Sequence, residues 1–178
     1  GRRHVKPQTR VRSEIPAEYK WDLSSIFPSW EAWDEAFARL DGLITAFAAR
    51  RGSLASGPDA LLGAYRAMDE LGQLAYAVYY YPSLAHDEDQ RDNEVGARRQ
   101  QVQILMSRWQ EATSWFSPEL LGLPIGGERA WTDASPDLAV YRFAIENLYR
   151  LQEHVRDDKG ERLMSLVSRF AGAPSDAY

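Results

Sequence analysis

Residues 89–116, DQRDNEVGARRQQVQILMSRWQEATSWF, decide the fold, because they contain no proline and a single glycine, Gly96. Their apolar residues recur at alternating steps of three and four, the heptad spacing that places side chains on one face of an α-helix. A helix of this length spans about 40 Å. A sustained heptad face favours a long antiparallel partner, and the preceding helix is the obvious candidate. The face consists of Val95, Val102, Leu105, Trp109, Ala112 and Phe116, with Arg98 in the remaining heptad position.

Two helices are expected before this one. The first begins after Ser29, whose hydroxyl can accept a hydrogen bond from a free amide of the first turn. It ends before Gly52, which can take a left-handed conformation. The second begins at Pro58, and Pro82 should break or kink it near residues 79–81, because proline has no amide hydrogen and clashes with the preceding turn. The apolar stripe of the first helix is Trp30, Trp33, Phe37, Leu40, Ile44 and Phe47.

The segments after residue 116 also favour helix. Ser117 followed by Pro118 begins a short helical turn, and Ser135 followed by Pro136 begins a helix that ends near His154. Residues 122–134 are rich in glycine and are expected to form a surface loop. A last helix is expected between residues 158 and 172.

No segment alternates apolar and polar residues for long enough to predict a strand. The sequence therefore predicts an all-α fold of elongated helical hairpins with one long heptad-patterned helix. Residues 15–28 are expected to form an N-terminal extended arm, because they contain two prolines and show no clear period. The expected divisions are a basic leader at 1–14, a hairpin region at 15–116 and a second helical segment at 117–178.

Composition excludes several classes of site. The chain has 178 residues, a formal net charge of −5 and no cysteine, which excludes disulfides, cysteine-bound metals and cysteine nucleophiles. The three histidines, His4, His86 and His154, are too far apart to form a paired metal site at helical spacing. No run of about 18 apolar residues suits a membrane span.

The charges are unevenly distributed. Residues 1–13 carry five basic residues and no acidic one, so the rest of the chain sums to −10. We interpret residues 1–14 as a disordered leader. A basic arm can alternatively contact nucleic acid or anionic lipid, but the acidic remainder argues against nucleic-acid binding.

Three groups of side chains and one histidine are candidates for a functional site. The acidic residues 87–94 fail the calcium-loop pattern, because no glycine stands at the sixth position and Arg98 stands at the twelfth. Carboxylate pairs such as Glu31 and Glu35 read as solvent-facing, and His154 fits a helix end. The aromatic group could line a cleft, although such residues more often serve core and rim packing. Its members are Tyr76, Tyr79, Tyr80, Tyr81, Trp109 and Trp115. The sequence therefore predicts no catalytic, cofactor-binding or metal-binding residue.

A resemblance adds to this interpretation. Residues 15–33, IPAEYKWDLSSIFPSWEAW, resemble the start of oligoendopeptidase F and its relatives in the thimet-oligopeptidase clan. Later motifs follow in the family order, and the resemblance covers residues 15–178. These motifs are MDEL at 68–71, VYYYPSL at 78–84, FSPEL at 116–120, YRFAIENL at 141–148, ERLMS at 161–165 and APS at 173–175.

The resemblance implies a zinc metalloendopeptidase that hydrolyses short peptides inside a channel. Two histidines of a His-Glu-x-x-His helix would bind zinc, and its glutamate would activate water. This chain has no His-Glu pair. We therefore expect this chain to be a non-catalytic N-terminal domain that helps to enclose the substrate channel. The parent enzyme is expected to be cytoplasmic. Its zinc site would lie in a C-terminal catalytic domain that is absent from this chain.

Other interpretations stay open. The expected partners are that catalytic domain and the parent's oligopeptide substrates, with possible self-association through an exposed apolar face and no nucleic acid or membrane. The alternative is a stand-alone α-helical protein-interaction or oligomerisation module. A nucleic-acid binder that uses the basic arm is the weaker third hypothesis.

Overall fold

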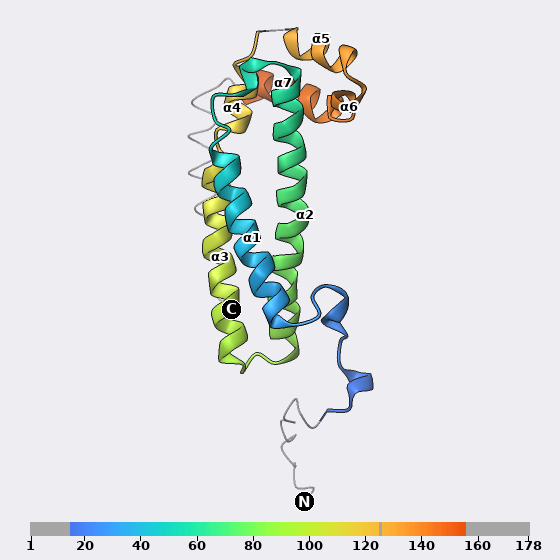
Figure 1. Cartoon of the computed structure of the whole chain (residues 1–178), viewed down its shortest axis with the longest axis vertical. Helices are drawn as coiled ribbons and strands as arrows, with labels where there is room; N and C mark the ends of the chain where they lie inside the picture. Colours follow the sequence, from blue (N-terminus) through green and yellow to red (C-terminus); the bar gives the residue numbers. More distant parts are fainter. Residues whose placement is uncertain (1–14, 125, 156–178) are drawn as a thin grey trace, which may run out of the picture. The chain divides into compact units, whose positions relative to one another are not determined.

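Figure 1 shows the computed structural model, which describes residues 15–124 and 126–155. Within these residues every regular element is helical and no strand occurs, so the prediction of an all-α fold is confirmed. The leader at 1–14 and the last expected helix, 158–172, lie outside the described residues. The longer helices are α1 (Trp30–Ala48), α2 (Pro58–Glu88), α3 (Asn93–Thr113), α5 (Gly127–Ala134) and α7 (Arg142–Val155). The shorter elements are α4 (Phe116–Leu121), α6 (Pro136–Ala139) and the 3₁₀ turns η2 (Ala17–Tyr19), η3 (Leu23–Ser25) and η4 (Leu54–Ser56).

The chain divides into two compact units. The first runs to Arg51 and resumes over Ala64–Ser114, and the second contains Gly52–Gly63 and the chain from Trp115 onward. The division therefore falls within α2, which is one continuous helix. The boundary expected after residue 116 remains a prediction.

The first unit is built from α1, α3 and α2 from Ala64 onward. Figure 1 shows α2 and α3 running in opposite directions, as expected for consecutive helices, but α3 approaches α1 more closely than it approaches α2. The sequence prediction named only α2 as the partner of α3, whereas α1 packs on α3 as well. The core joins all three helices, and each buried side chain contributes about 1.5–3 kcal/mol to stability. Its members include Trp33, Leu40, Ile44, Phe47, Leu71, Val78, Val102 and Leu105.

The ends of α3 differ from the prediction. The helix begins at Asn93, not at residue 89, because Asp92 caps it. The Asp92 Oδ1 atom accepts hydrogen bonds from the amides of Glu94 (2.9 Å) and Val95 (3.1 Å). An Asp side chain that satisfies these free amides fixes the start of a helix.

Pro82 does not break α2, so the predicted break is wrong, and the kink given as its alternative stays a prediction. Proline removes the amide that would bond the carbonyl of Val78, four residues earlier. The indole Nε1 of Trp33, on α1, donates to that carbonyl at 2.9 Å. A donor from another helix thus satisfies the buried acceptor, and α2 continues to Glu88.

The second unit is held by side-chain hydrogen bonds to backbone. The carboxylate of Glu119, on α4, accepts from the amide of Gly52 at 2.7 Å and from the amide of Leu54 at 2.8 Å. Gly52 has a φ of 87°, the left-handed conformation expected of it. The Tyr149 hydroxyl donates to the carbonyl of Leu120 at 2.7 Å, which links α7 to α4.

Two expectations for the second unit need correction. Residues 127–134 form α5 rather than a loop, because Gly126 and Gly127 stand at the start of the helix and the residues after them favour it. Thr132 is buried on α5. The helix expected from Ser135 is interrupted: Ser135 caps the short α6, and α7 begins only at Arg142.

None of the helices in the described part of the chain has both the length and the apolar character needed to cross a membrane.

Candidate functional site

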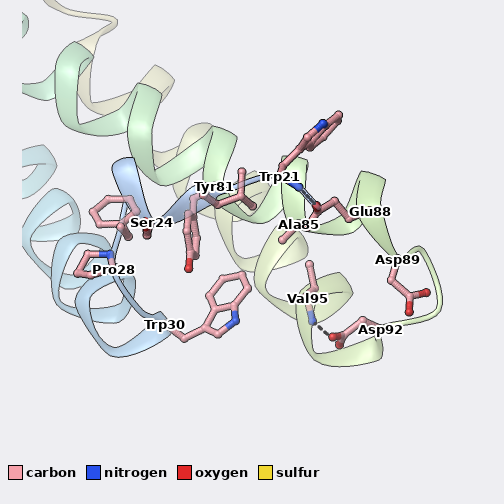
Figure 2. Close-up of a pocket in the computed structure, with 12 residues that line it drawn as sticks. Trp21, Ser24, Pro28, Trp30, Tyr81, Ala85, Glu88, Asp89, Asp92 and Val95 are labelled. Atoms are coloured by element: carbon pink, nitrogen blue, oxygen red, sulfur yellow. Dashed lines mark hydrogen bonds between the residues drawn. The ribbon is translucent and has the colours of Figure 1, made fainter. Parts of the chain in front are cut away.

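An open pocket of about 420 Å³ lies where the N-terminal arm meets the end of α2 and the start of α3. Figure 2 shows Trp30 and Tyr81 on one side of this pocket and Val95 and Asp92 on the other. We call it the Tyr81 pocket. Its lining residues are Trp21, Leu23, Ser24, Phe27, Pro28, Trp30, Tyr81, Ala85, Glu88, Asp89, Asp92 and Val95.

The local sequence explains how the arm forms its part of the pocket. The Asp22 carboxylate accepts from the amide of Ser24 at 3.0 Å and from its hydroxyl at 2.6 Å, which caps η3. These hydrogen bonds lower the pKa of Asp22. The amide of Trp21 donates to Oε1 of Glu88 at 2.7 Å, so the arm is attached to the last turn of α2.

Aromatic rings form the apolar wall. The ring centroid of Tyr81 lies 5.4 Å from that of Phe27 and 4.7 Å from that of Trp30, both in edge-to-face arrangements. Such pairs add to the stability that burial alone provides. Burial raises the pKa of the Tyr81 hydroxyl, the nearby carboxylate of Glu31 raises it further, and Arg98 opposes the rise.

Arg98 occupies the one position of the heptad face of α3 that is not apolar. Its guanidinium carbon lies 4.5 Å from the centroid of Trp30 and 5.9 Å from that of Trp33. The first distance is typical of a cation–π contact. The guanidinium Nε also lies 3.8 Å from a carboxylate oxygen of Asp34, so its charge has an acidic neighbour.

The acidic stretch 87–94 is part of this site, but its carboxylates have structural roles. Glu88 holds Trp21, Asp92 caps α3, and Asp89 forms an ion pair with Arg91, whose Nε lies 3.0 Å from Oδ1. Within the described residues, no group of three His, Asp or Glu residues could hold a metal ion. The part of the chain that the structure describes therefore offers no set of ligands for the zinc that the resemblance implies.

The aromatic group predicted from the sequence divides between core and surface. Tyr81 is buried, whereas Tyr76, Tyr79 and Tyr80 are exposed on α2. The rings of Tyr76 and Tyr80 lie 4.3 Å apart. Trp109 is half-buried, and Trp115 belongs to the second unit.

The other candidate residues do not gather into a site. Ser29 lowers the pKa of Glu31 by hydrogen bonding at the start of α1. His86 Nδ1 lies 2.8 Å from a guanidinium nitrogen of Arg99. The side chain of His154 lies outside what the structure describes.

Sequence reasoning missed the Tyr81 pocket, although a signal for it existed. The stretch before α1 carries aromatic residues without a helical period. That pattern predicts an extended segment packed on the rest of the fold, but it does not predict a pocket. Nothing in the sequence places the acidic stretch 87–94 beside Trp21.

Comparisons with known proteins give consistent matches. A family model described as Oligopeptidase F matches residues 119–178. Oligopeptidase PepF of Bacillus subtilis is 28% identical over 167 residues, which cover 94% of this chain and 25% of the relative. Group B oligopeptidase PepB of Streptococcus agalactiae is 26% identical and covers 94% of this chain and 28% of its own length.

Two crystal structures share the fold. One is of a candidate peptidase from Chlamydophila abortus, with a TM-score of 0.76, 25% identity and coverage of 96% of this chain and 29% of that chain. The other is of oligoendopeptidase-F from Enterococcus faecium, with a TM-score of 0.64, 26% identity and coverage of 83% and 29%. The chain spans about a quarter of the length of the curated relatives it matches.

Proposed function

We propose, from its similarity to the N-terminal part of oligoendopeptidase F, that this chain serves as the non-catalytic N-terminal domain of a peptidase of that type. The observation that carries the proposal is the coverage: similarity extends over 94% of this chain but over only 25% of Oligopeptidase PepF. The rest of such a protein would supply the zinc ligands and the water-activating glutamate.

The role proposed for the domain is to help enclose the substrate channel. Helices with rigid apolar cores form a wall that admits short, extended oligopeptides and excludes folded chains. Such a wall selects substrates by size without a specificity pocket of its own. The partners are then the catalytic domain and the oligopeptide substrates of a cytoplasmic enzyme.

The gene itself tests the proposal most directly. The reading frame downstream of Tyr178 should encode a His-Glu-x-x-His sequence within a few hundred codons. A stop codon directly after Tyr178 would overturn the proposal and favour the interaction module.

A second experiment tests whether catalysis requires the part of the protein that follows residues 1–178. The longer protein should cleave a short fluorogenic peptide in a reaction that a chelator abolishes, whereas residues 1–178 alone should neither cleave it nor bind zinc tightly. Chelator-sensitive cleavage by a clean preparation of residues 1–178 would contradict the assignment of this domain as non-catalytic.

The alternative, a stand-alone interaction or oligomerisation module, has one observation in its favour. Three large apolar side chains of the second unit are exposed: Val140 (77%), Phe143 (76%) and Leu151 (51%). Large apolar side chains that are left exposed can serve as contacts for another protein.

A further inference from the structure

One side of α7 carries an apolar stripe that the described part of the chain leaves open. Ala144, Leu148 and Leu151 follow one another at steps of four and three, so they lie on one side of the helix. Ala144 is exposed, Leu148 is half-buried and 51% of Leu151 is exposed. We call these three residues the α7 stripe. Ile145 is buried and belongs to the side of α7 that packs within the second unit, so the α7 stripe is available to another helix.

The chain that follows α7 has a matching stripe. α7 ends at Val155, and residues 156–178 follow it directly, outside the described residues. Their sequence predicts a helix over 158–172. Isolated helices of about 12–15 residues are marginally stable in water, so a helix here needs an apolar surface to pack against. Its own apolar residues recur at steps of three and four, at Leu163, Leu166 and Phe170.

The connection between the two helices is short. The end of α7 at Val155 and the capping pair Asp158 and Glu161 place it at residues 156–158. A connection of about 2–5 residues is usual between two antiparallel helices. In such a hairpin, residues that lie equally far from the middle of the connection face one another. The middle here is Asp157.

Counting outward from Asp157 brings the two stripes together. Each residue of the α7 stripe is as far from Asp157 as one residue of the other stripe. The smallest side chain faces the largest, which suits the interdigitation of two packed helices. The facing pairs are Leu151 with Leu163, Leu148 with Leu166, and Ala144 with Phe170. The position of the connection and the spacing of the apolar residues therefore agree, although neither was needed to derive the other.

The short connection favours this segment over a separate partner. A segment held by a short linker has an effective concentration in the millimolar range. A second copy of the chain at micromolar concentration would compete poorly for the same stripe. The family model that matches residues 119–178 also includes both α7 and the segment, so the two belong to one matched stretch.

We propose that residues 159–172 form a helix that packs antiparallel on α7 and covers the α7 stripe. The second unit then continues to the end of this helix. Phe143 lies about 100° around the helix axis from Ala144, outside the stripe, and it stays exposed, as does Val140, which precedes α7. The proposal does not depend on the proposed function, because no peptidase activity enters its test.

NMR of residues 1–178 tests the contacts directly. At a concentration where the chain is monomeric, methyl NOEs should connect Leu151 with Leu163 and Leu148 with Leu166. A mixture of labelled and unlabelled chains should show none of these NOEs between molecules. NOEs found only between molecules would assign the α7 stripe to a second copy, and the lack of any NOE from Leu151 to residues 161–171 would leave it open. Either result overturns the proposal.

A matched pair of substitutions tests the packing through amide hydrogen exchange. Leu166→Asp places a charge in the interface and should speed the exchange of residues 161–171 about tenfold or more, because the helix loses its partner. Ser165→Asp adds the same charge on the side of the predicted helix that faces away from α7, so exchange should stay within about twofold of the wild type. Leu151→Asp, on α7 itself, should act on residues 161–171 as Leu166→Asp does. Equal exchange rates in Leu166→Asp and Ser165→Asp would also overturn the proposal.

Discussion

Pro82 lies inside α2, and a residue of another helix replaces the hydrogen bond that it removes. The Trp33 indole is a donor only, and it donates to the carbonyl that Pro82 leaves free. The two residues are therefore coupled, although they lie on different helices. This coupling explains why the rule that proline ends a helix fails here: the rule considers donors of the same helix, whereas the replacement comes from 45 residues away in the sequence.

We expect Trp33→Phe to lower the free energy of unfolding by about 1–3 kcal/mol from the unsatisfied Val78 carbonyl alone, with a further loss from the smaller ring. In a Pro82→Ala background the cost should fall by about 1 kcal/mol, because the new amide of residue 82 restores a donor. Urea unfolding of the four proteins gives the coupling energy. A Gln110→Ala background, which changes an exposed position on α3, should show no coupling with Trp33→Phe.

Tyr81 gives the first unit a dependence on alkaline pH. Its folded-state pKa is raised, chiefly by burial, so its contribution is complete below the unfolded pKa of about 10. That contribution is lost as the pH rises from there through the folded pKa, because the unfolded chain releases the proton first. The free energy of unfolding should therefore decline more steeply above about pH 10 in the wild type than in Tyr81→Phe. Parallel slopes in urea titrations at pH 9–11 would contradict this assignment.

At the scale of the element, the caps determine where the helices begin. Asp92 fixes the start of α3 through two amides. Asp92→Ala should destabilise the chain by about 0.5–2 kcal/mol, whereas Asp92→Asn should cost only a few tenths, because an asparagine side chain can accept the same bonds. Thermal unfolding followed by circular dichroism compares the two. Equal losses in both variants would show that charge, rather than capping, matters at this position.

The sequence predicted the helices better than their ends and partners. The apolar stripes of α1 and α3 identify helix without reference to the rest of the chain, because a periodicity of 3.6 residues is a local property. The α5 helix was missed because Gly126 and Gly127 dominate the local pattern, while the burial of Thr132 depends on tertiary packing. The Tyr81 pocket also depends on tertiary structure and could not be predicted locally, since the hydrogen bond between Trp21 and Glu88 joins residues that are 67 apart in the sequence.

At the scale of the whole molecule, the similarity to longer proteins and the exposed apolar side chains bear on the same property. Relatives such as Oligopeptidase PepF are matched over only a quarter of their length. Under the proposed function, the remainder of such a protein would cover part of this chain's surface. Phe143 and Val140, each more than three-quarters exposed, are then the side chains whose burial would contribute most.

We therefore expect residues 1–178 to self-associate through this surface when they are prepared alone. Sedimentation equilibrium should show a weight-average mass that rises with concentration, because burying a large apolar side chain contributes about 1.5–3 kcal/mol. Phe143→Arg should shift the association to higher concentration. Gln110→Arg, which adds the same charge at an exposed polar position of α3, should not. A strictly monomeric wild type at high concentration, or equal effects of the two substitutions, would show that this apolar surface does not drive association.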